Sequence, residues 1–366
     1  MLIGICGAKC AGKSTVAQYL IEHHGFKKLH LELSEDKTSQ NGVKGTAPSD
    51  SEETGPAVNG GHVASLPYHT RNSPPSHTFT TTAALLDFVT KSWRSRWVIT
   101  SIPNEAVLDA LARRPFFILI SVDAPLTVRW RRHQARHAAS SPPSPTTAMS
   151  LEDFVAESDA HLYAAAGGVL PLMSRATIRL LNTSGDLAHL YATLGKLDLT
   201  DGDRLRPSWD AYFMSLSSLA ARRSNCMKRA VGCVLVGPSR RVVSTGYNGT
   251  PRGVRNCGEG GCPRCNSGET SGVSLATCLC LHAEENALLE AGRERIREGS
   301  VLYCNTCPCL TCSIKIVQVG ISEVVYNQGY SMDGEAAEVF RSAGVRLRQF
   351  SPPADGLIHL EKMELY

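Results

Sequence analysis

The sequence predicts an α/β protein made of two consecutive domains. Short apolar runs typical of buried strands alternate with helix-like segments along most of the 366 residues; this alternation indicates sheets flanked by helices. A glycine-rich loop begins the chain, and a histidine and cysteine motif lies within 281–318. We therefore expect a parallel α/β domain over 1–200, a three-layer α/β/α domain with a mixed sheet over 206–352, and a C-terminal tail over 353–366.

The composition is that of a globular protein. Hydrophobic residues make up 42%, charged residues 20%, and the net charge is +4, too mild to argue for a nucleic-acid or membrane partner. No apolar run is long enough to span a bilayer, and the N-terminus lacks the pattern of a signal peptide. Thirteen cysteines, clustered in the second half, then indicate metal binding in a reducing compartment, the cytoplasm, the nucleus or both.

The chain begins with a phosphate-binding motif. Residues 2–6 predict a buried strand, 13–24 predict a helix that Gly25 ends, and G-A-K-C-A-G-K-S between them matches G-x-x-x-x-G-K-[ST]. In such a loop the backbone N–H groups surround phosphates, the lysine reaches the β- and γ-phosphates, and the serine holds Mg²⁺. The expected nucleotide-binding residues are Gly7, Gly12, Lys13 and Ser14.

Further strands are expected at 96–102 and 116–124, a basic helix at 125–136, and a strand, turn and helix over 177–194. This set is similar to the small P-loop nucleotide and nucleoside kinases. Where those kinases carry a Mg²⁺-binding aspartate after a strand, this chain has Thr100, Ser101 and Ile102. Three interpretations stay open: an active kinase, nucleotide binding without turnover, and a structural vestige. The departure disfavours the kinase, so the domain is expected to be degenerate.

Two polar segments interrupt the first domain. Residues 34–78 and 139–150 are rich in Ser, Gly and Pro and predict disordered insertions. The domain boundary is expected at 199–208. Beyond it the pattern predicts helices, hairpin strands and later strands in the order 208–225, 230–236, 241–248, 301–306, 323–327, 334–343 and 345–350.

The second domain carries a set of residues suited to a catalytic zinc site. His282 and Glu284 form H-x-E, and Cys309 and Cys312 form P-C-x-x-C. One imidazole and two thiolates leave the fourth zinc position open for water, whose pKa the metal lowers. A carboxylate that does not bind the metal can then move the water proton, and Glu284 fits that role.

Two simpler interpretations compete with a catalytic site. Cys304, Cys307, Cys309 and Cys312 could form a structural zinc knuckle, but their spacing is too tight and leaves His282 without a partner. A lone histidine would be a plain helix residue; here it is not alone.

The same motif is the known signature of zinc nucleobase deaminases. With HAEENA, LYCNTCPCLTC, GYNGTPRG and RSNCMKRAVGCVLV, the region 206–351 closely resembles the zinc cytidine/deoxycytidylate deaminase family, and within it the fungal deoxycytidylate deaminases. The resemblance implies the cytidine-deaminase fold and hydrolysis of dCMP to dUMP and ammonia, which supplies thymidylate synthesis. It also implies activation by dCTP with Mg²⁺, inhibition by dTTP and assembly into homohexamers.

The substrate contacts are less explicit. Asn248 in GYNGTPRG matches the family position that contacts the sugar, and the glycine-rich turn offers N–H groups to a phosphate. Arg252 and Tyr330 are further candidates for the phosphate or the base. The alternative for this loop is a simple type II turn.

A glycine-rich loop with little apolar content predicts a second, structural zinc, which related deaminases carry near here. Such a loop needs a metal to be ordered. We expect four ligands from six cysteines, with Cys257, Cys262, Cys265 and Cys280 leading and Cys226 and Cys278 as alternatives. Buried reduced thiols are the competing interpretation.

Three other functions are weighed against dCMP deamination. The first is deamination of another cytosine or adenine nucleotide or of a nucleic acid, which an aromatic content of 6% without a basic stripe disfavours. The second is a zinc regulatory module that has lost catalysis, which the intact Glu284 argues against. The third is a nucleotide kinase with an appended zinc domain.

Overall fold

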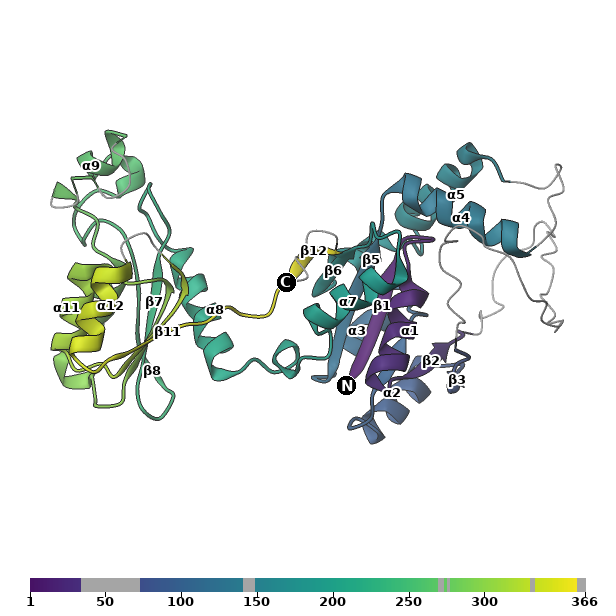
Figure 1. Ribbon diagram of the computed structural model, residues 1–366, viewed down its shortest axis with the longest axis horizontal. Coiled ribbons are helices and arrows are strands. Elements are labelled where there is room, and N and C mark those ends of the chain that lie inside the picture. The colour runs from purple at the N-terminus through teal and green to yellow at the C-terminus, as the bar shows by residue number, and fades with distance from the viewer. Residues whose placement is uncertain (34–72, 141–148, 269–272, 275–276, 330–332, 361–366) are drawn as a thin grey trace. The chain divides into compact units, whose positions relative to one another are not determined.

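The computed structural model describes residues 1–33, 73–140, 149–268, 273–274, 277–329 and 333–360. The chain divides into two compact units (Figure 1): unit 1 holds residues 1–205 and the segment from 354 onward, and unit 2 holds residues 206–353. Most of the two expected insertions, 34–72 and 141–148, lies outside the described residues. In the described part of the chain, no helix is both long and apolar enough to cross a membrane.

Unit 1 is built on a seven-stranded sheet in which every pairing is parallel, in the order β12-β6-β5-β1-β4-β2-β3. Its strands are β1 (Leu2–Gly7), β2 (Lys27–Leu31), β3 (His77–Phe79), β4 (Trp97–Ile99), β5 (Phe117–Asp123), β6 (Ile178–Leu181) and β12 (Gly356–His359). β1 lies at the centre and is buried along its whole length, as its apolar run predicts. The parallel α/β class expected for this region is confirmed; its kinase-like identity stays a prediction.

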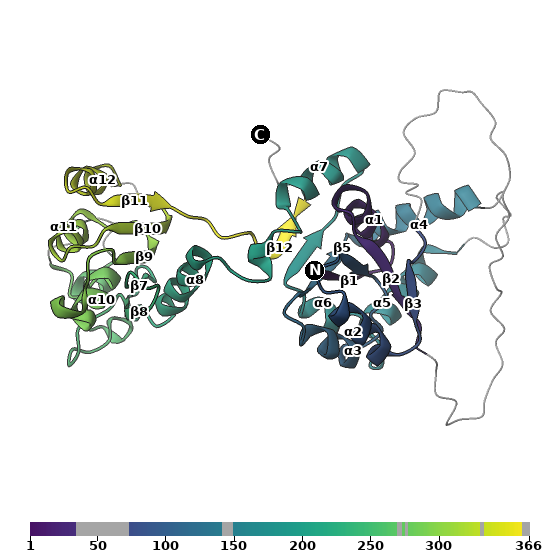
Figure 2. The same cartoon turned by 90° about the horizontal axis from the view of Figure 1, so that it is seen from below.

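Helices cover both faces of this sheet. Figure 2 shows α1 and α7 on one face and α2, α3 and α6 on the other. The helices are α1 (Lys13–His24), α2 (Thr82–Lys91), α3 (Glu105–Ala112), α4 (Leu126–Ser140), α5 (Leu151–Tyr163), α6 (Leu170–Ser174) and α7 (Leu187–Leu197). The rings of Tyr19 on α1 and Tyr191 on α7 meet edge to face, 5.1 Å apart.

Two segments differ from the sequence expectation. The end of the expected insertion at 34–78 is ordered, because His77–Phe79 forms β3 and pairs with β2. Residues 353–366 were expected to be a tail, but Gly356–His359 forms β12 and pairs with β6. There Ile358 and Leu360 are buried in the unit 1 core. A short strand whose partner lies far away in the sequence gives no local periodic signal.

Unit 2 contains a five-stranded mixed sheet in the order β11-β10-β9-β7-β8. β7 pairs antiparallel with β8 and β9, and β9, β10 and β11 are parallel. The strands are β7 (Gly232–Val236), β8 (Val242–Tyr247), β9 (Val301–Thr306), β10 (Glu323–Gln328) and β11 (Arg346–Gln349). The helices are α8 (Trp209–Ala221), α9 (Pro263–Asn266), α10 (Ala283–Ala291), α11 (Leu310–Gln318) and α12 (Asp333–Ser342).

Alternation along β7 divides the core of unit 2 into two layers. Cys233 and Leu235 belong to the cluster that contains α10, α11 and α12 residues, whereas Val234 and Val236 pack with Phe213 and Met214 of α8. Figure 1 shows α8 on one side of the sheet and α11 and α12 on the other. The predicted three-layer α/β/α arrangement with a mixed sheet is therefore present.

Candidate metal centre

The structure brings the predicted histidine and cysteine motif together. His282 Nδ1 lies 3.3 Å from Cys309 Sγ and 3.4 Å from Cys312 Sγ, and the three ligand atoms are within 4.8 Å of one another. His282 is the N-cap of α10, and Cys309 is the N-cap of α11, with Cys312 in its first turn. Two helix N-termini therefore meet at this point, and their partial positive charge favours thiolates.

The arrangement fits a zinc ion. Tetrahedral zinc with Zn–N of about 2.0 Å and Zn–S of about 2.3 Å places nitrogen and sulfur ligands roughly 3.5 Å apart. The two nitrogen–sulfur distances of 3.3 and 3.4 Å are close to that value. With three protein ligands, the set leaves one tetrahedral position open.

Two contacts that the sequence analysis did not find hold the ligand-bearing helices. Lys315 on α11 forms a 2.6 Å ion pair with Glu285 on α10; because both are partly exposed, it adds only about 0.2–1 kcal/mol. Gly246 on β8 permits the close approach of α10, since a Cβ there would lie 2.1 Å from the Ala283 carbonyl oxygen. Gly246 lies within β8, one residue before its end, and a glycine within a strand is the sequence signal for a close backbone approach.

Glu284 lies beside this set, only 4% exposed. Burial raises the pKa of its carboxyl to about 7, because a charged carboxylate loses its hydration there. The Cys312 side chain lies within hydrogen-bonding reach of it. A carboxyl with a pKa near neutrality can both accept and release a proton.

The cysteine and histidine side chains of this site shift one another's pKa. Hydrogen bonds from Cys312 and His282 lower the pKa of Cys309 to about 3, and the Cys309 sulfur raises the pKa of His282 to about 9. The thiolate is the form of cysteine that binds a metal. A metal needs the neutral imidazole, so its binding releases protons.

The four-cysteine knuckle is not supported. Among the described residues, the ligand cluster at this site joins Cys309 and Cys312 to His282 and contains neither Cys304 nor Cys307. Cys304 on β9 pairs instead with Cys233 on β7 in the sheet, and burial raises the pKa of both thiols.

The three candidate substrate-binding residues lie in different environments. Asn248 is buried, and its side chain accepts hydrogen bonds from Ser224 Oγ and Val231 N and donates to the Arg229 carbonyl. It therefore holds the loop before β7, and its contact with a sugar stays a prediction. Arg252 is exposed, and Tyr330 lies outside the described residues.

The GYNGTPRG segment contains a tight turn. Val254 N donates to the Pro251 carbonyl over 3.1 Å, and Gly253 has φ of 86°. This geometry matches the competing type II turn interpretation of that segment.

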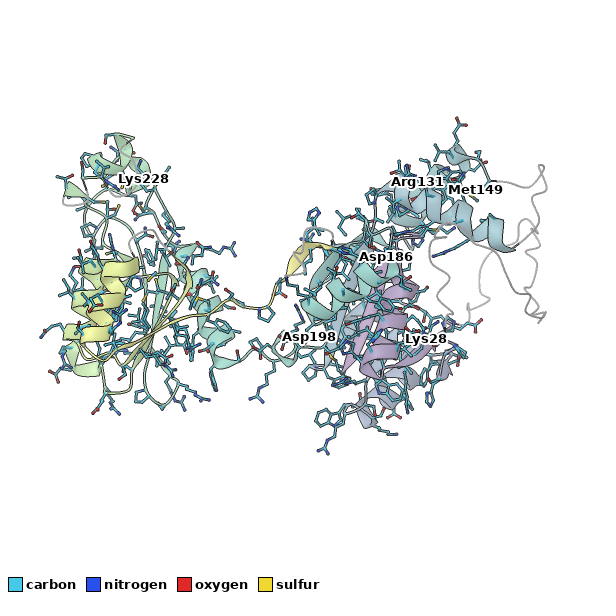
Figure 3. All side chains as sticks on the ribbon, in the orientation of Figure 1. Lys28, Arg131, Met149, Asp186, Asp198 and Lys228 are labelled. Carbon is cyan, nitrogen blue, oxygen red and sulfur yellow. The ribbon has the colours of Figure 1, made fainter. Side chains whose placement is uncertain are left out.

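The cysteine-rich loop gathers all six candidate sulfurs. Two groups of four have their sulfurs within 4.8 Å of one another: Cys226, Cys257, Cys265 and Cys280, and Cys262, Cys265, Cys278 and Cys280. The leading set from the sequence is neither group, because Cys257 and Cys262 fall in different groups. The spacing of the cysteines predicted that these residues lie together, but it did not predict which sulfurs belong to the same group of four. Figure 3 labels Lys228, two residues after Cys226, at the same end of unit 2 as α9.

In unit 1 the predicted phosphate loop joins β1 to α1. Gly7 and Gly12 have φ of 142° and 109°, and a Cβ on Gly7 would lie 2.0 Å from the Val122 carbonyl oxygen. Lys13 Nζ donates to the Gly7 and Ala8 carbonyls, each over 2.9 Å. Arg132 on α4 donates to the Ala11 carbonyl over 3.0 Å, so a second cation lies against the loop; the basic character of 125–136 was its sequence signal.

At the position that argues against kinase activity, a side chain forms a structural hydrogen bond. Ser101 follows β4, and its hydroxyl accepts a 2.8 Å hydrogen bond from Leu31 N at the end of β2. A short hydroxyl therefore links two strand ends at the position where a P-loop kinase would carry a carboxylate.

Known proteins match both units. Residues 207–328 match the cytidine and deoxycytidylate deaminase zinc-binding region. A deoxycytidylate deaminase of Schizosaccharomyces pombe is 43% identical over 97% of this chain and 99% of its own length. The chain belongs to the cytidine and deoxycytidylate deaminase family. A zinc-binding enzyme family thus accounts for the histidine and cysteine motif of unit 2.

Two further matches complete the comparison. A deoxycytidylate deaminase of Saccharomyces cerevisiae is 40% identical to this family member over 96% of the chain and 97% of its own length. The crystal structure of a cyanophage S-TIM5 dCMP deaminase in complex with dCMP and dUMP is 29% identical, with a TM-score of 0.32, and covers 38% of this chain and 94% of that chain. The two yeast relatives therefore extend over unit 1 as well as unit 2.

Proposed function

We propose that this chain hydrolyses dCMP to dUMP and ammonia at the site formed by His282, Glu284, Cys309 and Cys312. The observation that carries the proposal is a buried carboxyl with a pKa near 7 beside a three-ligand set that leaves one metal position open. The names of the yeast relatives and the ligands in the cyanophage structure support the choice of substrate.

His282, Cys309 and Cys312 would hold the zinc ion. Bound there, zinc acts as a Lewis acid that makes water a nucleophile at neutral pH. Glu284 takes the proton of the attacking water and delivers it to N3 of the cytosine ring as the water oxygen adds to C4. Glu284 then carries the proton of the hydroxyl added at C4 to the amino group. The C4–N bond breaks, ammonia leaves, and the oxygen stays on C4 as a carbonyl.

The test measures ammonia release from the purified full chain with dCMP, CMP, deoxycytidine and dCTP as substrates, together with zinc content. Turnover of dCMP above the other three supports the proposal. Turnover of none of them, with zinc bound, would contradict it and favour a nucleic-acid substrate or a regulatory module.

A second function concerns unit 1: we propose that Gly7, Gly12, Lys13 and Ser14 bind the phosphates of a nucleotide. The positive φ values of both glycines and the two cations at the loop support this. Lys13→Ala should weaken binding of ATP, dCTP or dTTP measured by calorimetry at least about 10-fold. Lys91→Ala, on the exposed surface of α2, is the matched control, and equal affinities of both variants would contradict the proposal.

Regulation and assembly follow from the resemblance alone. We propose activation by dCTP with Mg²⁺, inhibition by dTTP and assembly into homohexamers. Adding either effector to the dCMP assay and measuring the mass in solution test these points. A cytoplasmic or nuclear location also stays a prediction, and a structural zinc in the cysteine-rich loop is proposed on the sulfur distances given above.

A further inference from the structure

We propose that the cysteine-rich loop holds two zinc ions in a six-cysteine cluster, with Cys265 and Cys280 bridging both ions. The inference deepens the proposal of one structural zinc, and it does not depend on the substrate. Its basis is that the two four-cysteine groups share these two residues. Two tetrahedra that share an edge need six ligands, of which two are common, and the loop supplies that number and that sharing.

The sulfur distances match such a cluster. Tetrahedral zinc with Zn–S of about 2.3 Å separates its sulfurs by roughly 3.8 Å. Cys265 Sγ lies 4.0 Å from Cys226, 3.8 Å from Cys278 and 3.9 Å from Cys280, and Cys262 lies 3.9 Å from Cys278. A disulfide would need about 2.05 Å, and all six thiols are free.

The sulfurs themselves form the interior of the loop. A separate buried cluster consists of Cys257, Cys262, Cys265 and Cys280, with Cys226 and Cys278 packed against it. No aliphatic or aromatic side chain belongs to this cluster among the described residues. Reduced thiols alone offer little apolar area to order a loop, which disfavours the interpretation without metal.

Each group also has its own backbone donors to sulfur. Met227 N donates to Cys257 Sγ over 3.5 Å in the first group, and Leu279 N donates to Cys262 Sγ over 3.4 Å in the second. The N–H groups of residues 228 and 229 bond the Cys226 sulfur. Hydrogen bonds to sulfur stabilise the thiolate form that zinc needs, and they occur in both groups rather than in one.

A buried cation lies beside the six sulfurs. Two Zn²⁺ ions with six thiolates carry two negative charges. The guanidinium of Arg264, itself buried, lies within hydrogen-bonding reach of Cys265 and Cys278, and a cation there offsets part of the remaining charge.

The cluster would also position the catalytic ligand. Cys280 lies two residues before His282, and Leu281 between them pairs with Gly249 through two backbone hydrogen bonds of 3.1 and 2.8 Å. Fixing Cys280 therefore fixes the entry of the chain into α10.

The first experiment counts zinc in the untagged full chain, by elemental analysis and native mass spectrometry. We expect about three ions per chain, one at His282 and two in the loop. A count of two would overturn the two-ion cluster but leave one structural zinc, and a count of one would overturn both. None of these counts depends on whether dCMP is turned over.

The second experiment uses variants and a spectroscopic probe. Cys226→Ser and Cys278→Ser remove one unshared ligand from each group, and each should lower the count by about one; Cys10→Ser, in unit 1, is the control that should not. Should a variant fail to fold, the wild-type chain loaded with ¹¹³Cd decides. Two of its resonances should be coupled through shared thiolates, and uncoupled resonances would contradict the bridging.

Discussion

The two cysteine-containing sites of unit 2 differ in what holds their ligands in place. His282, Cys309 and Cys312 stand at the starts of α10 and α11, whose packed faces bury Ala283, Ala287 and Ile316. The six loop sulfurs have no such support and form their own interior. The difference indicates that the apolar core preforms the site at His282, whereas the loop would depend on the proposed zinc for its order.

The largest effect is expected at the preformed site. Glu284→Gln should lower dCMP turnover about 10²–10⁴-fold, because the proton carrier is lost, while zinc content stays unchanged. Glu290→Gln, on the same helix but exposed, is the matched control. Turnover of Glu284→Gln within a few-fold of wild type would show that the carboxyl is not the proton carrier.

Removal of the metal should affect the two sites of unit 2 differently. After chelation, the amides of Met227 and Leu279, which donate to loop sulfurs, should exchange hydrogen at least roughly 100-fold faster, since structural zinc contributes about 10 kcal/mol or more to small metal-dependent folds. The Ser313 amide in α11, bonded to the Cys309 carbonyl, should keep most of its protection. Equal loss at all three amides would remove the contrast between the sites.

The contribution of the core to the preformed site can be tested at a single glycine. Gly246→Ala places a Cβ 2.1 Å from the Ala283 carbonyl oxygen, so α10 must shift. We expect the free energy of unfolding to fall by about 1–3 kcal/mol and turnover to fall about 10-fold. Gly237→Ala is the control, since its Cβ would meet Val243 at 3.5 Å; equal stability of both variants would refute the close-packing argument.

The smallest effect is expected in a part of unit 2 that needs no metal. Asp210 on α8 bonds Arg348 over 2.8 and 3.1 Å and Tyr303 over 2.8 Å. Burial acts to raise the pKa of Asp210, but these hydrogen bonds outweigh it, so its pKa in the folded chain lies below the usual value.

The stability from this contact is present above the unfolded pKa of about 3.9 and is lost as pH falls through the lower folded value. Asp210→Asn should therefore lower the free energy of unfolding by about 1 kcal/mol at pH 7, since the pair is partly exposed, and by less at pH 3. Urea denaturation at both pH values measures this, and an equal effect at both would show that the charge is not involved.

Local signals predicted much of the fold. The apolar run of β1, the phosphate loop and Gly25, which ends α1 with φ of 67°, are each encoded within a few residues. Ser208, the first residue of the predicted segment 208–225, is the N-cap of α8, and its side chain accepts from Ala211 N. Other elements, whose hydrophobic patterns are weak or mixed, were not predicted. β12 was not predicted because its partner, β6, is distant in the sequence.

The candidate site shows the same limit. The spacing of H-x-E and P-C-x-x-C was enough to bring His282, Cys309 and Cys312 together, because each motif sits at the start of one helix. The division of the loop cysteines into two groups depends on how the loop folds back on itself. Likewise, the side chain of Asn248 is hydrogen-bonded to a loop that precedes it by some twenty residues. No sequence motif predicts these hydrogen bonds.

The return of the chain to unit 1 has a consequence for proteolysis. Because Gly356–His359 adds a strand beside β6, residues 206–353 are inserted between two pieces of one sheet. A single cut between Leu205 and Arg206 would leave two fragments that stay associated through β12. Releasing unit 2 in native form therefore takes a second cut near Pro353, and a gel that denatures the sample would report cleavage that a sizing column does not.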